Sequence, residues 1–235
     1  MYELNSRVRY SETDIDAKLS LTGIMNYMQD CSTFQSEDCG VGLAYLEEKN
    51  RAWLLSSWQI QILRRPALGE EITVCTWPYE IKGIYGLRNF TLMDGTGEYL
   101  VKANSCWFLL DTEAGKPVRV TREDVDAYGD EEPKLSMDYA PRKIRLPEHM
   151  EEAGRLVIMK HQIDTNHHVN NAQYVDMRWR PSRRKPTAGR SRRSAPSIKR
   201  RRCWEIRRSS CGRPERMDTW YLSAAETEAS LPMWN

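Results

Sequence analysis

Apolar and polar residues alternate along several stretches of the first half of the chain, and one stretch repeats apolar residues at helical spacing. Residues 4–10 alternate in the way that suits a half-buried strand. Ser20 stands where a helix N-cap is expected, and Gly40 is a natural helix end. Between them the apolar residues are spaced by three and four, which predicts a long helix over residues 21–38; they are Leu21, Ile24, Met25, Met28 and Cys31.

Four strand-like runs separated by turn residues follow the predicted helix. They cover residues 53–63, 71–78, 86–93 and 99–110, and Asp94-Gly95 is a hairpin signal between the last two. One helix followed by an antiparallel meander is the pattern of a sheet wrapped round a helix, the hotdog fold. We therefore expect an α+β structure whose first hotdog domain covers residues 1–120. A polar, proline-containing linker over residues 121–150 should follow it.

The beginning of the chain recurs further on. Residues 14–20 align with residues 164–170 at a constant offset, and a short strand-like run precedes each copy. An apolar helical pattern follows each copy. Such self-similarity indicates a duplicated unit. We therefore expect tandem hotdog domains, with residues 151–177 forming the start of the second.

The chain loses its apolar residues where the second sheet should begin. Residues 178–216 contain only two residues of the types Val, Leu, Ile, Met and Phe. The net charge of +2 hides a division: residues 1–177 carry 19 Lys and Arg against 28 Asp and Glu, whereas residues 178–235 carry 16 against 5. So few apolar residues cannot build a hotdog sheet. We expect an incomplete second hotdog and a basic tail over residues 178–235 that is disordered or out of frame.

The genetic code favours the out-of-frame interpretation. Read one nucleotide earlier, the codons for Cys203-Trp204-Glu205-Ile206 encode Leu, Met or Val, then Leu, Gly, and Asn or Asp. The corresponding turn of the first copy is Ala67-Leu68-Gly69-Glu70. We therefore prefer a frameshift near Met177 or Arg178, which makes the basic charge of the tail an accident. The alternative is a non-catalytic protein whose Arg-rich tail binds nucleic acid, but the tail lacks a regular aromatic or helical spacing.

Cysteine usage and hydropathy indicate a cytoplasmic protein. The six cysteines are scattered without C-x-x-C pairing, which favours reduced, mostly buried thiols over disulfides or a zinc site. No apolar stretch approaches the length of a membrane span, and the N-terminus lacks the pattern of a secretory signal. We expect no metal, no cofactor and no membrane partner.

The most specific motif of the chain lies in the second copy and reads Asp164-Thr165-Asn166-His167-His168-Val169-Asn170-Asn171. Here, and in residues 10–14 with the first helix, the chain resembles the acyl-acyl-carrier-protein (acyl-ACP) thioesterases of bacteria and plants. The second hotdog of that family carries the pattern D-x-N-x-H-V-N-N. The resemblance covers residues 1–177. It implies hydrolysis of fatty acyl-ACP, which releases free fatty acid and ends chain elongation.

The chemistry of the motif suits thioester hydrolysis, which needs an activated water and donors for a developing oxyanion. Asn166 can place an amide near the thioester oxygen, and His168 can accept or shuttle a proton near neutral pH. Asp164 can fix the orientation of its neighbours. In the resembling family the matching Asp, Asn and His belong to the catalytic set, together with a Glu from the following sheet. We therefore expect Asp164, Asn166 and His168 to be catalytic; the alternative is an Asx turn that only caps a helix.

The chain departs from the family in its second half. No in-frame Glu lies in a credible strand there, since Glu205 stands among arginines, and this puts the activity of this exact chain in doubt. The first copy has Lys18 where the second has His168, so the first half should not hydrolyse anything.

The sequence is compatible with more than one acyl carrier and more than one oligomeric state. An acyl-coenzyme A thioesterase is the alternative enzyme, because the hotdog fold serves both carriers. Arg64 and Arg65 are candidates for the basic patch that an acidic carrier protein requires, although an ordinary solvated face explains them equally well. A homodimer is compatible with the sequence.

Overall fold

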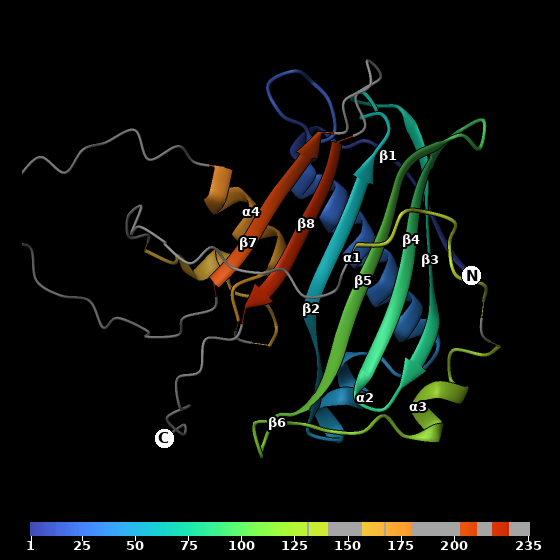
Figure 1. The fold of residues 1–235 in the computed structure, drawn as a ribbon, viewed down its shortest axis with the longest axis vertical. Coiled ribbons are helices and arrows are strands. Elements are labelled where there is room, and N and C mark those ends of the chain that lie inside the picture. The colour runs from blue at the N-terminus through green and yellow to red at the C-terminus, as the bar shows by residue number, and fades with distance from the viewer. Residues whose placement is uncertain (131, 141–156, 167, 180–202, 211–217, 226–235) are drawn as a thin grey trace, which may run out of the picture.

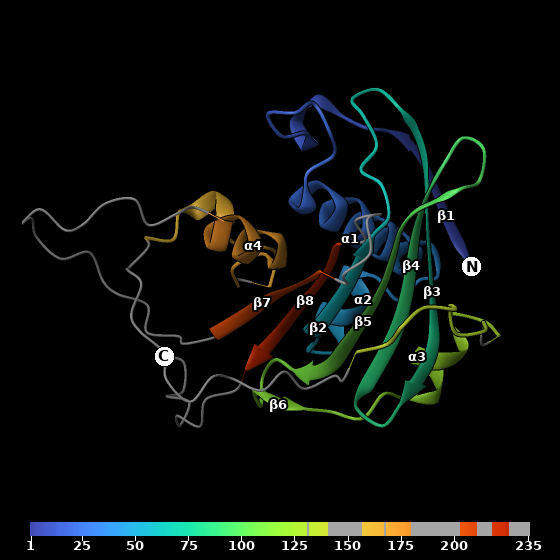
Figure 2. The ribbon, with the colours of Figure 1, turned by 45° about the horizontal axis from the view of Figure 1, so that its top comes forward.

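The first half of the chain is a long helix held in the hollow of a curled antiparallel sheet (Figures 1 and 2). The computed structural model describes residues 1–130, 132–140, 157–166, 168–179, 203–210 and 218–225. The helix is α1 (Leu21–Asp38). The first five strands run in the order β1-β3-β4-β5-β2, and they are β1 (Tyr2–Arg7), β2 (Arg51–Ile62), β3 (Glu71–Lys82), β4 (Tyr85–Asp94) and β5 (Tyr99–Asp111). This is the hotdog fold that the sequence pattern predicts.

Helix α1 begins and is buried as its sequence predicts. The hydroxyl of Ser20 accepts the N–H of Gly23 at 2.9 Å, which satisfies one of the free donors of the first turn. A Cβ atom at Gly23 would lie 2.6 Å from the backbone oxygen of Glu12, so this position requires glycine. The apolar face of the helix enters one core with the inner face of the sheet, where Trp58 and Phe90 meet edge to face at 5.6 Å between ring centroids.

Short elements close the ends of this domain. They are the 3-10 helix η1 (Tyr10–Glu12), α2 (Leu43–Glu48), β6 (Lys116–Pro117) and α3 (Arg122–Asp126). Helix α3 begins with a capping box between Thr121 and Asp124. The buried Asp124 carboxylate also accepts hydrogen bonds from the hydroxyl of Tyr45 at 2.9 Å and from Arg51 at 3.1 Å. This helix is therefore tied to α2 and β2.

Residues 132–140, expected to be linker, cross the face of the sheet that points away from α1 (Figure 1). Four side chains on that face stand in direct register across β3, β4, β5 and β2; they are Trp77, Asn89, Asn104 and Gln59. We call this set of three amide side chains and one indole the amide row. Three of them bind backbone groups of the crossing segment: Trp77 Nε1 donates to Pro133 O at 2.9 Å, Asn89 Oδ1 accepts from Leu135 N at 3.0 Å, and Gln59 Oε1 accepts from Ala140 N at 2.9 Å.

The second half packs against the first through both a helix and the sheet. The 3-10 helix η2 (Lys160–Gln162) precedes α4 (Asn171–Trp179), and Ala172 and Val175 of α4 are buried in the same core cluster as α1. Strand β8 (Asp218–Ala225) pairs antiparallel with β2, and β7 (Cys203–Ser210) pairs with β8. Figures 1 and 2 show β8 beside β2, so that the sheet continues in the order β2-β8-β7.

Two stretches of residues 178–235 are therefore strands, whereas the sequence predicted a disordered or out-of-frame tail. Strand pairing uses backbone N–H and C=O groups, and the edge of β2 offers an unpaired row of both. The sequences Trp220-Tyr221-Leu222 and Cys203-Trp204-Glu205-Ile206 also contain residue types that favour strands. A count of apolar residues does not register the backbone hydrogen bonds by which a strand pairs with the edge of β2. The rest of the tail lies outside the described residues, and the frameshift stays a prediction.

Burial agrees with the interpretation of the cysteines as reduced thiols where the structure describes their side chains. Cys31, Cys75 and Cys106 are buried, and none of them forms a disulfide with another described residue. Burial raises the pKa of the Cys31 thiol to about 12. Among the described helices, none combines the length and the hydropathy that crossing a membrane would require.

Candidate functional site

The motif of the second copy forms a tight turn closed by the carboxylate of Asp164. One oxygen of this carboxylate, Oδ1, accepts the backbone N–H of Asn166 at 2.9 Å and that of His168 at 3.1 Å. The N–H of Asp164 donates to the carbonyl of His168 at 2.8 Å, and Ile163 and Val169 form a β-bridge beneath the turn. The three predicted catalytic residues are thus brought into one turn, whose backbone Asp164 holds.

The same turn occurs in the first copy, 150 positions earlier (residue 14 for residue 164). The N–H of Asp14 donates to the carbonyl of Lys18 at 3.0 Å, and Asp14 Oδ1 accepts the N–H of Asp16 at 3.0 Å. A β-bridge between Thr13 and Leu19 lies beneath it, and a 3-10 helix precedes each turn. The internal repeat predicted from the sequence is therefore present in the backbone geometry.

The two turns differ in what surrounds their side chains. Asp14, Asp16 and Lys18 are exposed, whereas Asp164, Asn166 and His168 are half-buried, and the Nδ1 atom of His168 is buried. The same backbone therefore presents an amide and an imidazole to a partly dry environment in the second copy only. Partial desolvation strengthens the electrostatic interactions that such groups offer a substrate.

Arg65 occupies the first turn. Its guanidinium forms an ion pair with Asp14 and donates to the carbonyls of Leu19 at 2.7 Å and Lys18 at 3.0 Å. Burial alone would raise the pKa of Asp14, but the hydrogen bond from Arg65 and the backbone N–H groups lower it. The first turn thus contains an ion pair between Arg65 and Asp14, and the expectation that it does not hydrolyse anything stays a prediction.

Neither candidate for a carrier-binding patch is free of internal partners. Arg64 bonds to Glu70 at 2.7 Å and to Asp94 at 3.1 Å, and Arg65 is held by the first turn as described. Both guanidinium groups therefore have structural roles within the first domain.

Two asparagines connect the second turn to its helix and to the first domain. The side chain of Asn170 accepts the N–H of Ala172 at 2.9 Å and so caps α4. The side chain of Asn171 donates to Oε1 of Gln29, on α1, at 3.5 Å. The motif therefore ends with one residue that starts its own helix and one that reaches the other half.

Gln162 and Gln29 contact the site but were not predicted from the sequence. Gln162 is buried, accepts the N–H of Met159 at 2.8 Å and donates to Gln173 of α4 at 3.3 Å. It occupies the position of Glu12 in the first copy, so extending the aligned repeat by two residues would have found it. Gln29 carries no such signal, because only the packing of α1 against α4 brings it to the motif. His167 lies outside the described residues, and Glu205 lies in β7, in register with Ser223 of β8.

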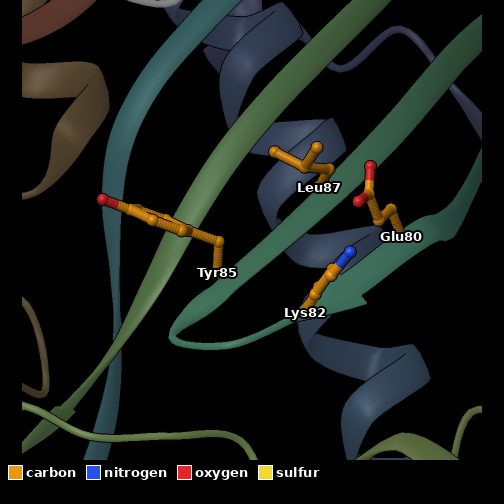
Figure 3. Close-up of a pocket in the computed structure, with 4 residues that line it drawn as sticks. All are labelled: Glu80, Lys82, Tyr85 and Leu87. Atoms are coloured by element: carbon orange, nitrogen blue, oxygen red, sulfur yellow. The ribbon is translucent and has the colours of Figure 1, made fainter.

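A hollow of about 300 Å³ lies elsewhere, at the β3–β4 hairpin on the sheet face away from α1 (Figure 3). It is lined by Glu80, Lys82, Tyr85 and Leu87. None of the predicted catalytic residues lines it. The turn, and not this hollow, is therefore the candidate site.

Known proteins resemble this chain over most of its length. Residues 1–128 match the family model described as the acyl-ACP thioesterase N-terminal domain. An acyl-[acyl-carrier-protein] hydrolase of Cuphea viscosissima is 26% identical over 190 residues, covering 74% of this chain and 45% of the relative. An oleoyl-acyl carrier protein thioesterase of Arabidopsis thaliana is 26% identical over 184 residues, covering 72% of this chain and 50% of the relative. The chain thus spans about half the length of these curated relatives.

Solved structures agree with the fold. An acyl-ACP thioesterase from Bacteroides thetaiotaomicron superposes with a TM-score of 0.64 at 25% identity, covering 74% of this chain and 70% of that one. A 12:0-ACP thioesterase from Umbellularia californica gives a TM-score of 0.61 at 21% identity, covering 74% and 72%. Since the family model matches more than half of the residues, this chain belongs to the acyl-ACP thioesterase family.

Proposed function

We propose that this protein hydrolyses fatty acyl-ACP thioesters, releasing free fatty acid and ending chain elongation. The observation that carries the proposal is the duplicated turn. One backbone geometry occurs twice, and only the half-buried copy presents the Asn and His that thioester hydrolysis can use. Membership of the family supports the same reaction.

In the proposed reaction a water molecule attacks the thioester carbonyl carbon. The amide of Asn166 donates to the oxygen as it becomes an oxyanion, and His168 takes the proton of the attacking water. The carbon–sulfur bond then breaks, and the carrier thiol leaves with a proton while the acid is released. Asp164 acts on the turn itself, because its Oδ1 atom already accepts two backbone N–H groups.

The repeat supplies matched controls for this proposal. Asn166→Ala and His168→Ala should each lower acyl-ACP hydrolysis by the full chain on the order of a hundredfold or more, as loss of an oxyanion donor or a general base does. Asp16→Ala and Lys18→Ala, at the same positions of the first turn, should leave the rate unchanged. Hydrolysis is measured as free fatty acid released from acyl-ACP, with acyl-coenzyme A as the competing substrate.

Three outcomes would count against the proposal. Equal losses from both turns would indicate a purely structural motif. Faster hydrolysis of acyl-coenzyme A would favour the other carrier. A full chain without thioesterase activity would contradict the function for this chain.

We further propose the division of the chain expected from its sequence: a hotdog domain over residues 1–120, a linker over 121–150, the start of a second hotdog over 151–177, and a tail altered by a frameshift. Resequencing the gene across the codons for Tyr174 to Trp204 tests the last part. An inserted or missing base supports it, and an intact frame contradicts it.

We also propose a cytoplasmic homodimer that meets ACP as its partner. The position of β7 as the last strand of the described sheet supports self-association, because such an edge can pair with a second copy. Sedimentation of the full chain should give twice the monomer mass, and a monomer at micromolar concentration would contradict the dimer. Fractionation of cells should recover the protein with the cytoplasm.

A further inference from the structure

Gln29 lies where the two halves of the molecule meet. It is half-buried on α1, and α4 of the second half packs against this helix. Ala172 and Val175 close the apolar part of the contact, with exposed fractions of 1% and 4%. At the end of α4 nearest the motif, Oε1 of Gln29 accepts the side-chain N–H of Asn171 at 3.5 Å. This is a polar contact from the first half to the motif itself.

Asn171 is joined to the turn by a continuous set of backbone bonds. Its neighbour Asn170 caps α4 and donates its N–H to the carbonyl of Gln162 at 2.9 Å. The turn behind it is closed by the bonds between Asp164 and His168. The turn and the helix start are therefore linked through these bonds, so loss of a contact at Asn171 should also loosen the turn.

The first copy anchors the equivalent residue differently. Its helix begins with Leu21, which packs against the core cluster of its own domain. The second copy has the polar Asn171 at this position, and its partner comes from α1. The exchange of an apolar anchor for a polar one therefore gives the second copy a contact with the first half.

We propose that Gln29 is a positioning residue for the turn of Asp164, Asn166 and His168: the first half supplies the acceptor that orients the site of the second. This inference rests on the proposed thioesterase function. Gln29 acts through Asn171. A shift of reacting groups on the order of 1 Å is enough to slow a reaction strongly, so one oriented hydrogen bond can matter for the rate.

Two substitutions that keep the length of the Gln29 side chain distinguish the role of its acceptor atom from the role of its bulk. Gln29→Met removes the acceptor and should lower kcat for acyl-ACP about three- to tenfold with KM unchanged, the effect of one neutral hydrogen bond. Gln29→Glu retains an acceptor for Asn171 and should stay within about twofold of the wild type. Thr33→Ala is the matched control, because its hydroxyl donates to the Gln29 carbonyl within α1 at 2.9 Å, and it should change neither constant.

A double-mutant cycle tests the route through Asn171. Asn171→Leu should lower kcat as Gln29→Met does, and the double variant should be no slower than the slower single variant. Wild-type kcat in Gln29→Met, an equal loss in Gln29→Glu, or additive losses in the double variant would each overturn the inference.

A second readout keeps this test separate from the proposed function. Hydrogen exchange of the Asn166 and His168 amides, which bond to Asp164, is measured by NMR on the full chain with or without activity. Gln29→Met should speed this exchange and shift the ring signals of His168, whereas Thr33→Ala should leave both unchanged. If the full chain lacks activity but these changes occur, the function fails and the positioning role stands. Unchanged exchange and ring signals in Gln29→Met overturn the positioning role.

Discussion

At the residue scale, Asp94 illustrates how one carboxylate organises the β4–β5 turn. It accepts the Thr96 hydroxyl at 2.6 Å, the N–H groups of Thr96 at 2.9 Å and Glu98 at 3.1 Å, and a bond from Arg64 at 3.1 Å. These bonds, above all that from the Thr96 hydroxyl, lower the pKa of Asp94 from 3.8 to about 2. Its charged form is therefore favoured in the folded state.

The pKa of Asp94 predicts an acid-dependent loss of stability. A lowered folded pKa means that the stabilisation is present above the unfolded value of 3.8 and is lost as the pH falls toward about 2. Asp94→Asn should therefore be less stable than the wild type at neutral pH, and the difference should shrink through this window. Urea unfolding at stepped pH measures it. Asp126→Asn, in an exposed ion pair with Arg122, is the control; a constant difference for Asp94→Asn across the window would contradict the assignment.

At the residue scale, the structure differs from the sequence prediction at the end of strand β3. The strand predicted over residues 71–78 ended at Pro78, a residue that cannot donate to a sheet ladder. Strand β3 instead continues to Lys82, since a bulge between Pro78 and Glu80 absorbs the missing donor. Helix α1, whose signals are all local, was predicted with the observed bounds.

At the element scale, the amide row shows that residues 132–140 are held by the first domain. Asn89 is fully buried, and its Oδ1 atom accepts both the Leu135 N–H at 3.0 Å and the Tyr139 hydroxyl at 3.2 Å. Gln59 is 5% exposed and holds the segment at Ala140. The segment predicted to be a linker is thus held by side chains of β3, β4 and β2, because amide and indole groups can pair with the backbone of any sequence.

Asn89→Ala should leave the half-buried N–H of Leu135 without its acceptor and cost about 1–3 kcal/mol of unfolding free energy. Protease cleavage within residues 132–140 should become faster for the same reason. Urea denaturation and limited proteolysis measure the two effects. Asn104→Ala is the matched control, because Asn104 belongs to the amide row but bonds to Tyr79. Equally rapid cleavage of residues 132–140 in Asn104→Ala would contradict the prediction, because it would show that the bonds of Asn89 to this segment do not account for its protection.

At the scale of the whole molecule, the second half completes surfaces of the first. Without β8, strand β2 would be the edge of the sheet; with it, residues Ser57–Ile62 are paired on both sides. Helix α4 covers α1 in the same way. The two halves therefore share one sheet and one core cluster.

A proline at Tyr221 should separate β8 from β2. Tyr221 stands in register with Gln59, and proline both removes a donor and disfavours a paired strand. Hydrogen exchange measured by mass spectrometry should become faster in the peptide covering residues 57–62. Ala229→Pro, beyond the strand, should leave that peptide unchanged. Unaltered exchange in Tyr221→Pro would mean that β8 does not cover β2 in solution, as expected for a disordered tail.

The sequence by itself determined what short-range patterns encode: the helix of the first domain, its meander, the repeated turn, and the motif of Asp164, Asn166 and His168. Helical spacing, strand alternation and turn chemistry act between residues a few positions apart, so one chain suffices to identify them. Only the tertiary structure decided that residues 132–140 lie on the amide row, that β8 pairs with β2, and that Gln29 reaches Asn171. These contacts join residues that are far apart in the chain, and their partners are selected by packing and backbone pairing, which leave no periodic signal in either segment alone.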